Sequence, residues 1–162
     1  MEYFIYNIEN LTDSEYEKWF SLMTKEKQDR VSRYKDFERR KCSVAGEKLV
    51  KEYIGKALNI SPEALVILTD KNGKPYIESC PIHFNISHCE NTLVYAFSDE
   101  EIGIDIENFN LHNDYDIIRT ISPILLKDNE NIITYQDSNF IKVLTEKSKI
   151  KLLKNGFSEN DV

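Results

Sequence analysis

The sequence has few cysteines, no long apolar run and no general excess of positive charge, and each shortage excludes a class of protein. Its cysteines, Cys42, Cys80 and Cys89, lack the paired spacing of a disulfide framework, so a reducing compartment fits best. No apolar stretch approaches the roughly 18–20 residues of a membrane span. The N-terminus carries acids where a signal peptide would carry Lys or Arg. We therefore expect a soluble, cytoplasmic protein without a membrane partner.

Positive charge is scarce overall but concentrated in one segment. The 162 residues carry a formal net charge of -7. This argues against nucleic-acid binding, because few cations are available to replace the counterions of a phosphate backbone. Lys and Arg nevertheless crowd residues 25–41. Two interpretations of that run stay open: a solvated helical face, or a platform for an anionic small molecule or an acidic protein partner.

The hydrophobic pattern predicts an α+β protein, with helices on one side of small antiparallel sheets. Thr12 and Glu15 form a capping box that begins the first helix. The sequence contains no internal repeat and no low-complexity segment. Helices are expected at residues 13–23, in the basic segment after Thr24, at 37–58 and 138–154, and more weakly at 114–121 and 122–127; strands are expected at 3–8, 65–69, 83–87, 92–98 and 102–106.

Two acids two residues apart, Asp105 and Glu107, are the first candidates for chemistry. In a strand, alternate residues share a face, so Ile104 and Ile106 would face the core and both carboxylates would point the other way. Neighbouring carboxylates repel each other unless a cation lies between them, and Mg²⁺ prefers such hard oxygen ligands. The alternative is a solvated strand face that carries two acids by chance.

Two further motifs precede this acidic strand. Ser87 and His88 follow a short alternating stretch, and a hydroxyl and an imidazole at a strand end can meet a phosphate. Lys74 and Pro75 follow Gly73, which permits close approach of a backbone to a ligand. Each motif alone is equally compatible with an ordinary turn. A zinc site built from Cys80, His83, His88 and Cys89 is a weaker alternative, because the spacings match no recognised zinc motif.

The three motifs occur in the order Gly-Lys-Pro (73–75), Phe-Asn-Ile-Ser-His (84–88) and Gly-Ile-Asp-Ile-Glu (103–107). Together they resemble the 4′-phosphopantetheinyl transferases of the surfactin-synthetase-activating (Sfp-like) type. The basic stretch 27–34 and the stretch 43–50 resemble the helix pair of that family. The resemblance covers about residues 1–110 of the sequence.

The resemblance implies a fold of two similar α+β halves packed as a pseudo-dimer, with coenzyme A between them. The N-terminal half would span residues 1–100, and an incomplete C-terminal half with the metal-binding strand would span 101–162. Such enzymes transfer the phosphopantetheine arm of coenzyme A to a serine of an apo acyl or peptidyl carrier protein, with Mg²⁺ as cofactor. The alternative is a catalytically impaired paralogue that binds coenzyme A or a carrier protein.

The resemblance also implies roles for individual residues. Asp105 and Glu107 would bind the metal, and Ser87 and His88 would contact phosphate, with His88 also a catalytic candidate. Lys74 and Pro75 would contact the nucleotide end of coenzyme A. Lys27 and Arg30 would lie near its 3′-phosphate.

The sequence departs from the family after the acidic strand. The family carries a W-[ST]-x-K-E-[AS] helix there, and residues 144–151 match it only with about one residue missing. A missing residue turns the rest of a helix by roughly 100°. Glu146 is then expected as third metal ligand or base, and Lys151 as a phosphate contact. Relatives continue well beyond residue 162, so we expect an incomplete second half that favours self-association.

Overall fold

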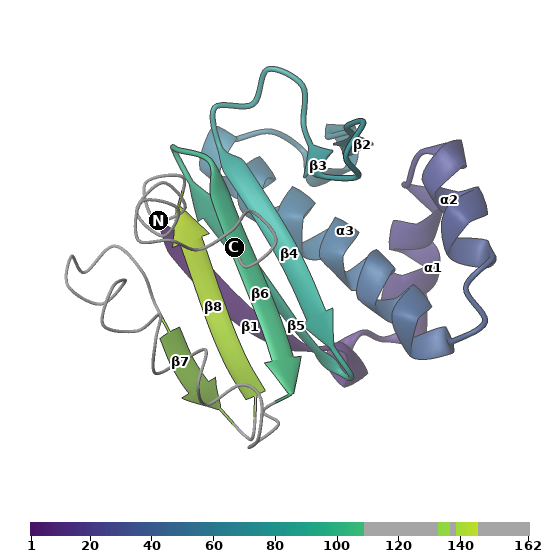
Figure 1. Cartoon of the computed structure of the whole chain (residues 1–162). Helices are drawn as coiled ribbons and strands as arrows, with labels where there is room; N and C mark the ends of the chain where they lie inside the picture. Colours follow the sequence, from purple (N-terminus) through teal and green to yellow (C-terminus); the bar gives the residue numbers. More distant parts are fainter. Residues whose placement is uncertain (109–132, 137–138, 146–162) are drawn as a thin grey trace.

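The computed structural model describes residues 1–108, 133–136 and 139–145, and shows an α+β protein as the sequence predicts (Figure 1). Within these residues, no helix is long and apolar enough to cross a bilayer. The helices are α1 (Asp13–Ser21), α2 (Lys25–Ser32) and α3 (Phe37–Leu58), with 3-10 turns η1 (Ile8–Asn10) and η2 (Pro62–Ala64). The strands are β1 (Glu2–Asn7), β2 (Leu68–Thr69), β3 (Pro75–Tyr76), β4 (His83–Cys89), β5 (Thr92–Ser98), β6 (Ile102–Asn108), β7 (Ile133–Gln136) and β8 (Asn139–Thr145).

Each helix begins at a side chain that satisfies free backbone N–H groups. Thr12 and Glu15 make the expected capping box at α1, and the Thr24 hydroxyl accepts a hydrogen bond from the Lys27 N–H at α2. The Asp36 carboxylate caps α3, and Asn59 ends α3 in the left-handed region at φ 55°. The start of every long helix is therefore encoded locally.

The described elements form three layers, with α3 and β6 on opposite faces of a central antiparallel sheet ordered β1-β5-β4 (Figure 1). Strand β5 is buried on both faces: Val94 and Ala96 pack against the isoleucines of β6, while Phe97 packs against α3. Strand β6 is the edge strand of a second antiparallel sheet, ordered β6-β8-β7. The strand that carries Asp105 therefore lies directly against the N-terminal sheet.

The helix expected at residues 138–154 is wrong over its first part, because residues 139–145 form strand β8. This stretch alternates Phe140, Lys142 and Leu144 with Ile141, Val143 and Thr145, which is a strand period rich in β-branched residues. Strand β8 pairs with β6 along its whole length, from Ile102 opposite Thr145 to Asn108 opposite Asn139. Backbone hydrogen bonds to β6 therefore determine the conformation of this segment, rather than the weak helical spacing of its apolar residues.

Three expected strands have different lengths in the structure, and one of them, β6, continues beyond Ile106 to Asn108. Strand β4 continues beyond Ser87 to Cys89, because it pairs with β5 as far as Thr92. The strand expected at 65–69 is reduced to Leu68–Thr69, which pairs with Pro75 and Tyr76. The helices expected at 114–121 and 122–127 lie outside the described residues.

We predict that the Cys42 thiol resists alkylation in the folded protein. Its side chain is 3% exposed, and burial, followed by the charges of Asp36 and Glu38, raises its pKa to about 11. After iodoacetamide treatment at pH 8, mass spectrometry of peptides should find Cys80 modified in native protein and Cys42 modified only after unfolding. Equal labelling of the two cysteines in native protein would contradict this burial.

Candidate functional site

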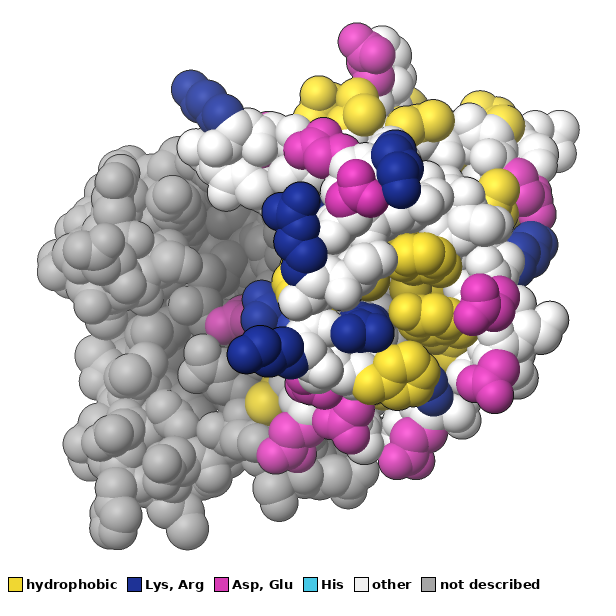
Figure 2. Space-filling model, turned by 90° about the vertical axis from the view of Figure 1, so that its right-hand side faces the viewer, with side chains coloured by type: hydrophobic (Ala, Val, Ile, Leu, Met, Phe, Trp, Pro, Cys, Tyr) yellow, Lys and Arg dark blue, Asp and Glu magenta, His cyan; other side chains and the backbone are white. Residues whose placement is uncertain are grey.

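A pocket between α2, α3, the β2–β3 turn and β4 brings together residues that are far apart in the sequence. Lys27, Arg30, Pro75 and His88 all line it, with Ser43, Gly46, Gly73 and apolar side chains between them. Figure 2 views the helical side of the molecule and shows several Lys and Arg side chains close together there. The cavity measures about 160 Å³. This is below the roughly 300–1,000 Å³ of a complete small-molecule site, so it suits one anionic group of a larger ligand.

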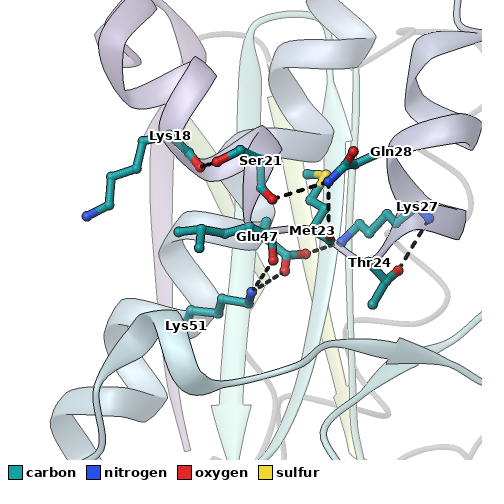
Figure 3. A network of polar contacts seen from close by, with 9 residues as sticks. Lys18, Ser21, Met23, Thr24, Lys27, Gln28, Glu47 and Lys51 are labelled. Carbon is teal, nitrogen blue, oxygen red and sulfur yellow. Dashed lines mark hydrogen bonds and ion pairs between the residues drawn. The ribbon is translucent and has the colours of Figure 1, made fainter.

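The ammonium group of Lys27 forms an ion pair with Glu47 of α3. Its Nζ lies 2.6 Å from Glu47 Oε2, and the Lys27 side chain is 14% exposed. The other carboxylate oxygen of Glu47 lies 2.7 Å from the Nζ of Lys51 (Figure 3). Glu47 and Lys51 are each 1% exposed, so the pocket residue Lys27 contacts a buried ion pair.

Strand β4 separates the Ser-His pair onto two faces. Phe84 and Ile86 pack towards α3, and His88 follows them on that side into the pocket. Ser87 lies on the opposite face, where its hydroxyl donates a 2.7 Å hydrogen bond to Asp105 Oδ1. On the same face, Asn85 Oδ1 accepts a 3.1 Å hydrogen bond from the Ile104 N–H. The structure thus groups His88 with the basic residues and Ser87 with the acidic strand.

The protonation state of the His88 ring is sensitive to nearby charge. Partial loss of water around the ring, followed by the positive charge of Arg39, lowers the pKa of His88 from the ordinary 6.5, while Asp36 acts in the opposite direction. Its imidazole is therefore mostly neutral at pH 7 in the free protein. A phosphate placed beside it would favour the charged form and raise the pKa.

This shift predicts a pH-dependent affinity. An NMR titration of the His88 ring should give a midpoint below 6.5 in the free protein and a higher midpoint once a phosphate group is bound beside it. By linkage, the affinity for such a phosphate ligand should increase as the pH falls from 8 towards 6. The variant His88→Gln should lose that dependence. A free-protein midpoint above 6.5 would contradict the environment described for the ring.

The Lys-Pro turn reaches two pockets. Pro75 lines the pocket described above, whereas Lys74 and Pro75 both line a neighbouring cavity of about 330 Å³. The Lys74 Nζ lies 3.2 Å from Glu101 Oε1. The turn is set by Asp70, whose carboxylate accepts hydrogen bonds from the N–H groups of Asn72 and Lys74, and Gly73 adopts φ 88°. Lys74 thus lies beside the basic pocket rather than in it.

The acidic strand has the expected orientation where its side chains are described. Ile104 and Ile106 are buried, and Asp105 is exposed with one carboxylate oxygen accepting from Ser87. Glu107 occupies its place in β6, opposite Phe140 of β8. The side chain of Glu107, and all of Glu146 and Lys151, lie outside the described part of the structure.

The zinc interpretation is wrong. Cys80 and His83 line the cavity beside Lys74, His88 lines the basic pocket, and Cys89 packs against the isoleucines of β6 on the other face of β4. The described residues contain no group of three or more His, Cys, Asp or Glu side chains that could hold a metal ion. These four residues are therefore spread over separate surfaces.

Sequence inspection missed three residues that shape the site, namely Glu47, Lys51 and Asn85. Glu47 and Lys51 stand four residues apart on the buried face of α3, beside Val50 and Ile54. Charged residues within an apolar stripe, spaced to pair with each other, were the available signal. For Asn85 the sequence offered no signal, because its acceptor role depends on the position of β6.

The described fold is α+β, with a basic pocket on one face of strand β4 and the Asp105 carboxylate on the other. Residues 10–100, more than half of the chain, match the family profile described as "4'-phosphopantetheinyl transferase, N-terminal". The chain belongs to the 4′-phosphopantetheinyl transferase family.

Similar curated proteins carry the same description. The 4′-phosphopantetheinyl transferase gsp of Aneurinibacillus migulanus is 38% identical over 90 residues, which are 56% of this chain and 38% of that protein. The 4′-phosphopantetheinyl transferase Sfp of Bacillus subtilis strain 168 is 33% identical over 106 residues, 65% of this chain and 47% of the relative. The match thus spans less than half the length of these relatives.

Proposed function

We propose that this protein transfers the 4′-phosphopantetheine arm of coenzyme A to a serine of an apo acyl or peptidyl carrier protein. The observation that carries this proposal is the convergence of Lys27, Arg30, Pro75 and His88 in one pocket. These residues come from separate segments and match the family's coenzyme A contacts. Family membership and the Asp105 carboxylate on the adjacent strand support the same assignment.

Each described residue has a defined part in such a reaction. The cations Lys27 and Arg30 would bind anionic groups of coenzyme A, and the neutral His88 imidazole at the rim could gain a proton as a phosphate approaches. Ser87 holds one oxygen of Asp105, which fixes the direction of the carboxylate. Phosphoryl transfer depends on such positioning, because the protein contributes little covalent chemistry.

The exposed carboxylate of Asp105 is a hard oxygen donor of the kind that Mg²⁺ prefers, so the residues fit this metal. We propose Asp105 and Glu107 as its ligands, with Glu146 as a third ligand or the base and Lys151 as a phosphate contact. When bound, Mg²⁺ would neutralise charge on the pyrophosphate and on the departing 3′,5′-adenosine bisphosphate.

The finer architecture is also a proposal. We assign residues 1–100 to one α+β half and residues 101–162 to a second half related to it as in a pseudo-dimer. The sheet β6-β8-β7 is the part of the second half that the structure describes, and it supports this division because its described strands pair with one another rather than with the strands of β1-β5-β4.

The direct test is a transfer assay. The protein is incubated with coenzyme A, Mg²⁺ and a panel of apo carrier proteins, and each carrier is weighed by mass spectrometry. We expect the mass of one phosphopantetheine to be gained by at least one carrier, and no gain when its acceptor serine is replaced by alanine. Absence of a mass gain with every carrier would reject the transferase assignment.

A module that binds coenzyme A without transferring its arm is the second candidate. Glu146 and Lys151, which the resemblance assigns to the family's next helix, lie outside the described residues. The pocket with Lys27 and His88 does not depend on that helix. Calorimetry that shows binding of coenzyme A, together with no turnover in the transfer assay, would support the module over the enzyme.

A further inference from the structure

The buried ion pair of α3 needs an explanation beyond stability. Glu47 and Lys51 are each 1% exposed, on a helix face that is otherwise apolar, with Val50 and Ile54 at 0%. Removing two charges from water is unfavourable, and a well-packed apolar pair of similar volume usually gives equal or greater stability. A buried pair in this position is thus expected to serve the pocket above it.

The contacts of the pair point to Lys27. Glu47 uses one oxygen for the Lys51 Nζ at 2.7 Å and the other for the Lys27 Nζ at 2.6 Å (Figure 3). Lys51 is fixed in turn by the Leu22 carbonyl, which accepts from its Nζ at 3.1 Å. The carboxylate of Glu47 is therefore fixed by Lys51 independently of its contact with Lys27. Two ammonium groups and one carboxylate leave the trio with a net positive charge.

Helix α2 depends on polar contacts of this kind. Only Val31 is buried along it, so apolar packing does little to fix its position. Gln28 donates from Nε2 to the carbonyl groups of Ser21 and Met23 at 3.2 and 3.0 Å, which fastens the helix start to the end of α1. The bond from Lys27 to Glu47 joins α2 to α3 at the pocket.

We propose that Glu47 and Lys51 are positioning residues, which hold the Lys27 ammonium in the pocket before an anionic group of the ligand arrives. This inference rests on the proposed function, with a phosphate of coenzyme A as the anion. A lysine side chain loses considerable rotamer freedom when it is immobilised, and ordering it in advance reduces that loss on binding. The ammonium has several donors, and Glu47 engages one side of it, so an anion can use the others.

The test separates positioning from simple packing through four proteins. Lys27→Met removes the cation, and the double variant Glu47→Gln, Lys51→Met removes the anchor while filling the same space without charge. The triple variant combines both changes. A matched control, Lys18→Met with Glu63→Gln, removes an exposed ion pair between α1 and η2, where the side chains are 52% and 42% exposed.

Calorimetry with coenzyme A should rank these variants. We expect Lys27→Met to weaken binding about 10- to 100-fold, as for a lost charged hydrogen bond. The anchor double variant, which retains Lys27, should weaken it about 3- to 10-fold, the change that corresponds to ordering one long side chain. The triple variant should bind no more weakly than Lys27→Met, because the anchor acts through Lys27. In the transfer assay the anchor variant should increase KM for coenzyme A and leave kcat unchanged.

Two binding results would overturn the proposal: wild-type affinity in the anchor variant, or losses that simply multiply in the triple variant. Thermal unfolding confirms that each variant is folded, and if the anchor variant does not fold, Glu47→Gln alone replaces it. The exposed control pair should bind like the wild type.

A ligand-free measurement keeps this inference separate from the proposed function. In NMR spectra, the two ε-methylene protons of an immobilised Lys27 should have distinct shifts in the wild type and should merge in the anchor variant. Merged signals in the wild type would overturn the positioning claim. Distinct signals in a wild type that binds no coenzyme A would support the anchor and reject the coenzyme A assignment.

Discussion

Asp105→Asn is expected to lower the rate of carrier modification at least about 100-fold, the scale seen when one group that stabilises transition-state charge is lost. The amide has the size of the carboxylate, and its oxygen can still accept from Ser87, so β6 should keep its place. What is lost is the negative charge that a divalent cation requires. Initial rates from mass spectrometry of the carrier, with saturating coenzyme A, measure the effect.

Asp99→Asn is the matched control for this variant. Asp99 is exposed in the turn between β5 and β6, where its carboxylate accepts a hydrogen bond from Ser98, and it is not among the residues that line either pocket. Its replacement should leave the rate within about twofold, a change typical of surface sites. Removal of Mg²⁺ by a chelator should abolish the wild-type rate, and Asp105→Asn should require more Mg²⁺ for its residual activity. Equal rates for the two variants would disprove the metal role of Asp105.

Phe97→Ala should produce the largest loss of stability among these variants, about 3–5 kcal/mol in the free energy of unfolding. Phe97 is 2% exposed and stacks on Tyr53 with ring centroids 3.6 Å apart. Its removal would leave a cavity between β5 and α3 that the rigid sheet cannot close. Urea unfolding followed by circular dichroism gives the comparison with the wild type.

Phe37→Ala supplies the control of the same chemistry. The Phe37 side chain begins α3 and is 53% exposed, although it contacts the ring of Tyr16. Its loss should change the free energy of unfolding by about 1 kcal/mol or less. If both substitutions destabilise the protein equally, the core between β5 and α3 is not packed as described.

Local signals in the sequence predicted much of this fold. The capping residues Thr12, Thr24 and Asp36 need only neighbouring backbone groups, so the starts of α1 and α2 were visible in the sequence. The alternation of residues 102–106 placed Ile104 inside and Asp105 outside, as the structure confirms. The α+β class followed from the same patterns.

What the sequence did not reveal depends on distant partners. Residues 139–145 become a strand because β6 offers them a ladder, which no local spacing records. The separation of Ser87 from His88 follows from the continuation of β4 to Cys89, which pairing with β5 determines. Glu47 and Lys51 could have been recognised as a pair within the apolar stripe of α3, but the contact of Glu47 with Lys27 depends on where α2 packs.

Strand β4 separates the basic pocket from the Asp105 carboxylate and contributes a residue to each. Adjacent residues project from it in opposite directions, His88 into the basic pocket and Ser87 onto Asp105. A ligand that shifts the backbone at either residue also shifts its neighbour, because the two are joined by one peptide bond. Thermodynamic linkage then requires reciprocity: if coenzyme A tightens the binding of the cation, the cation tightens the binding of coenzyme A by the same factor. Any such coupling between the two faces of β4 can therefore be measured from either ligand.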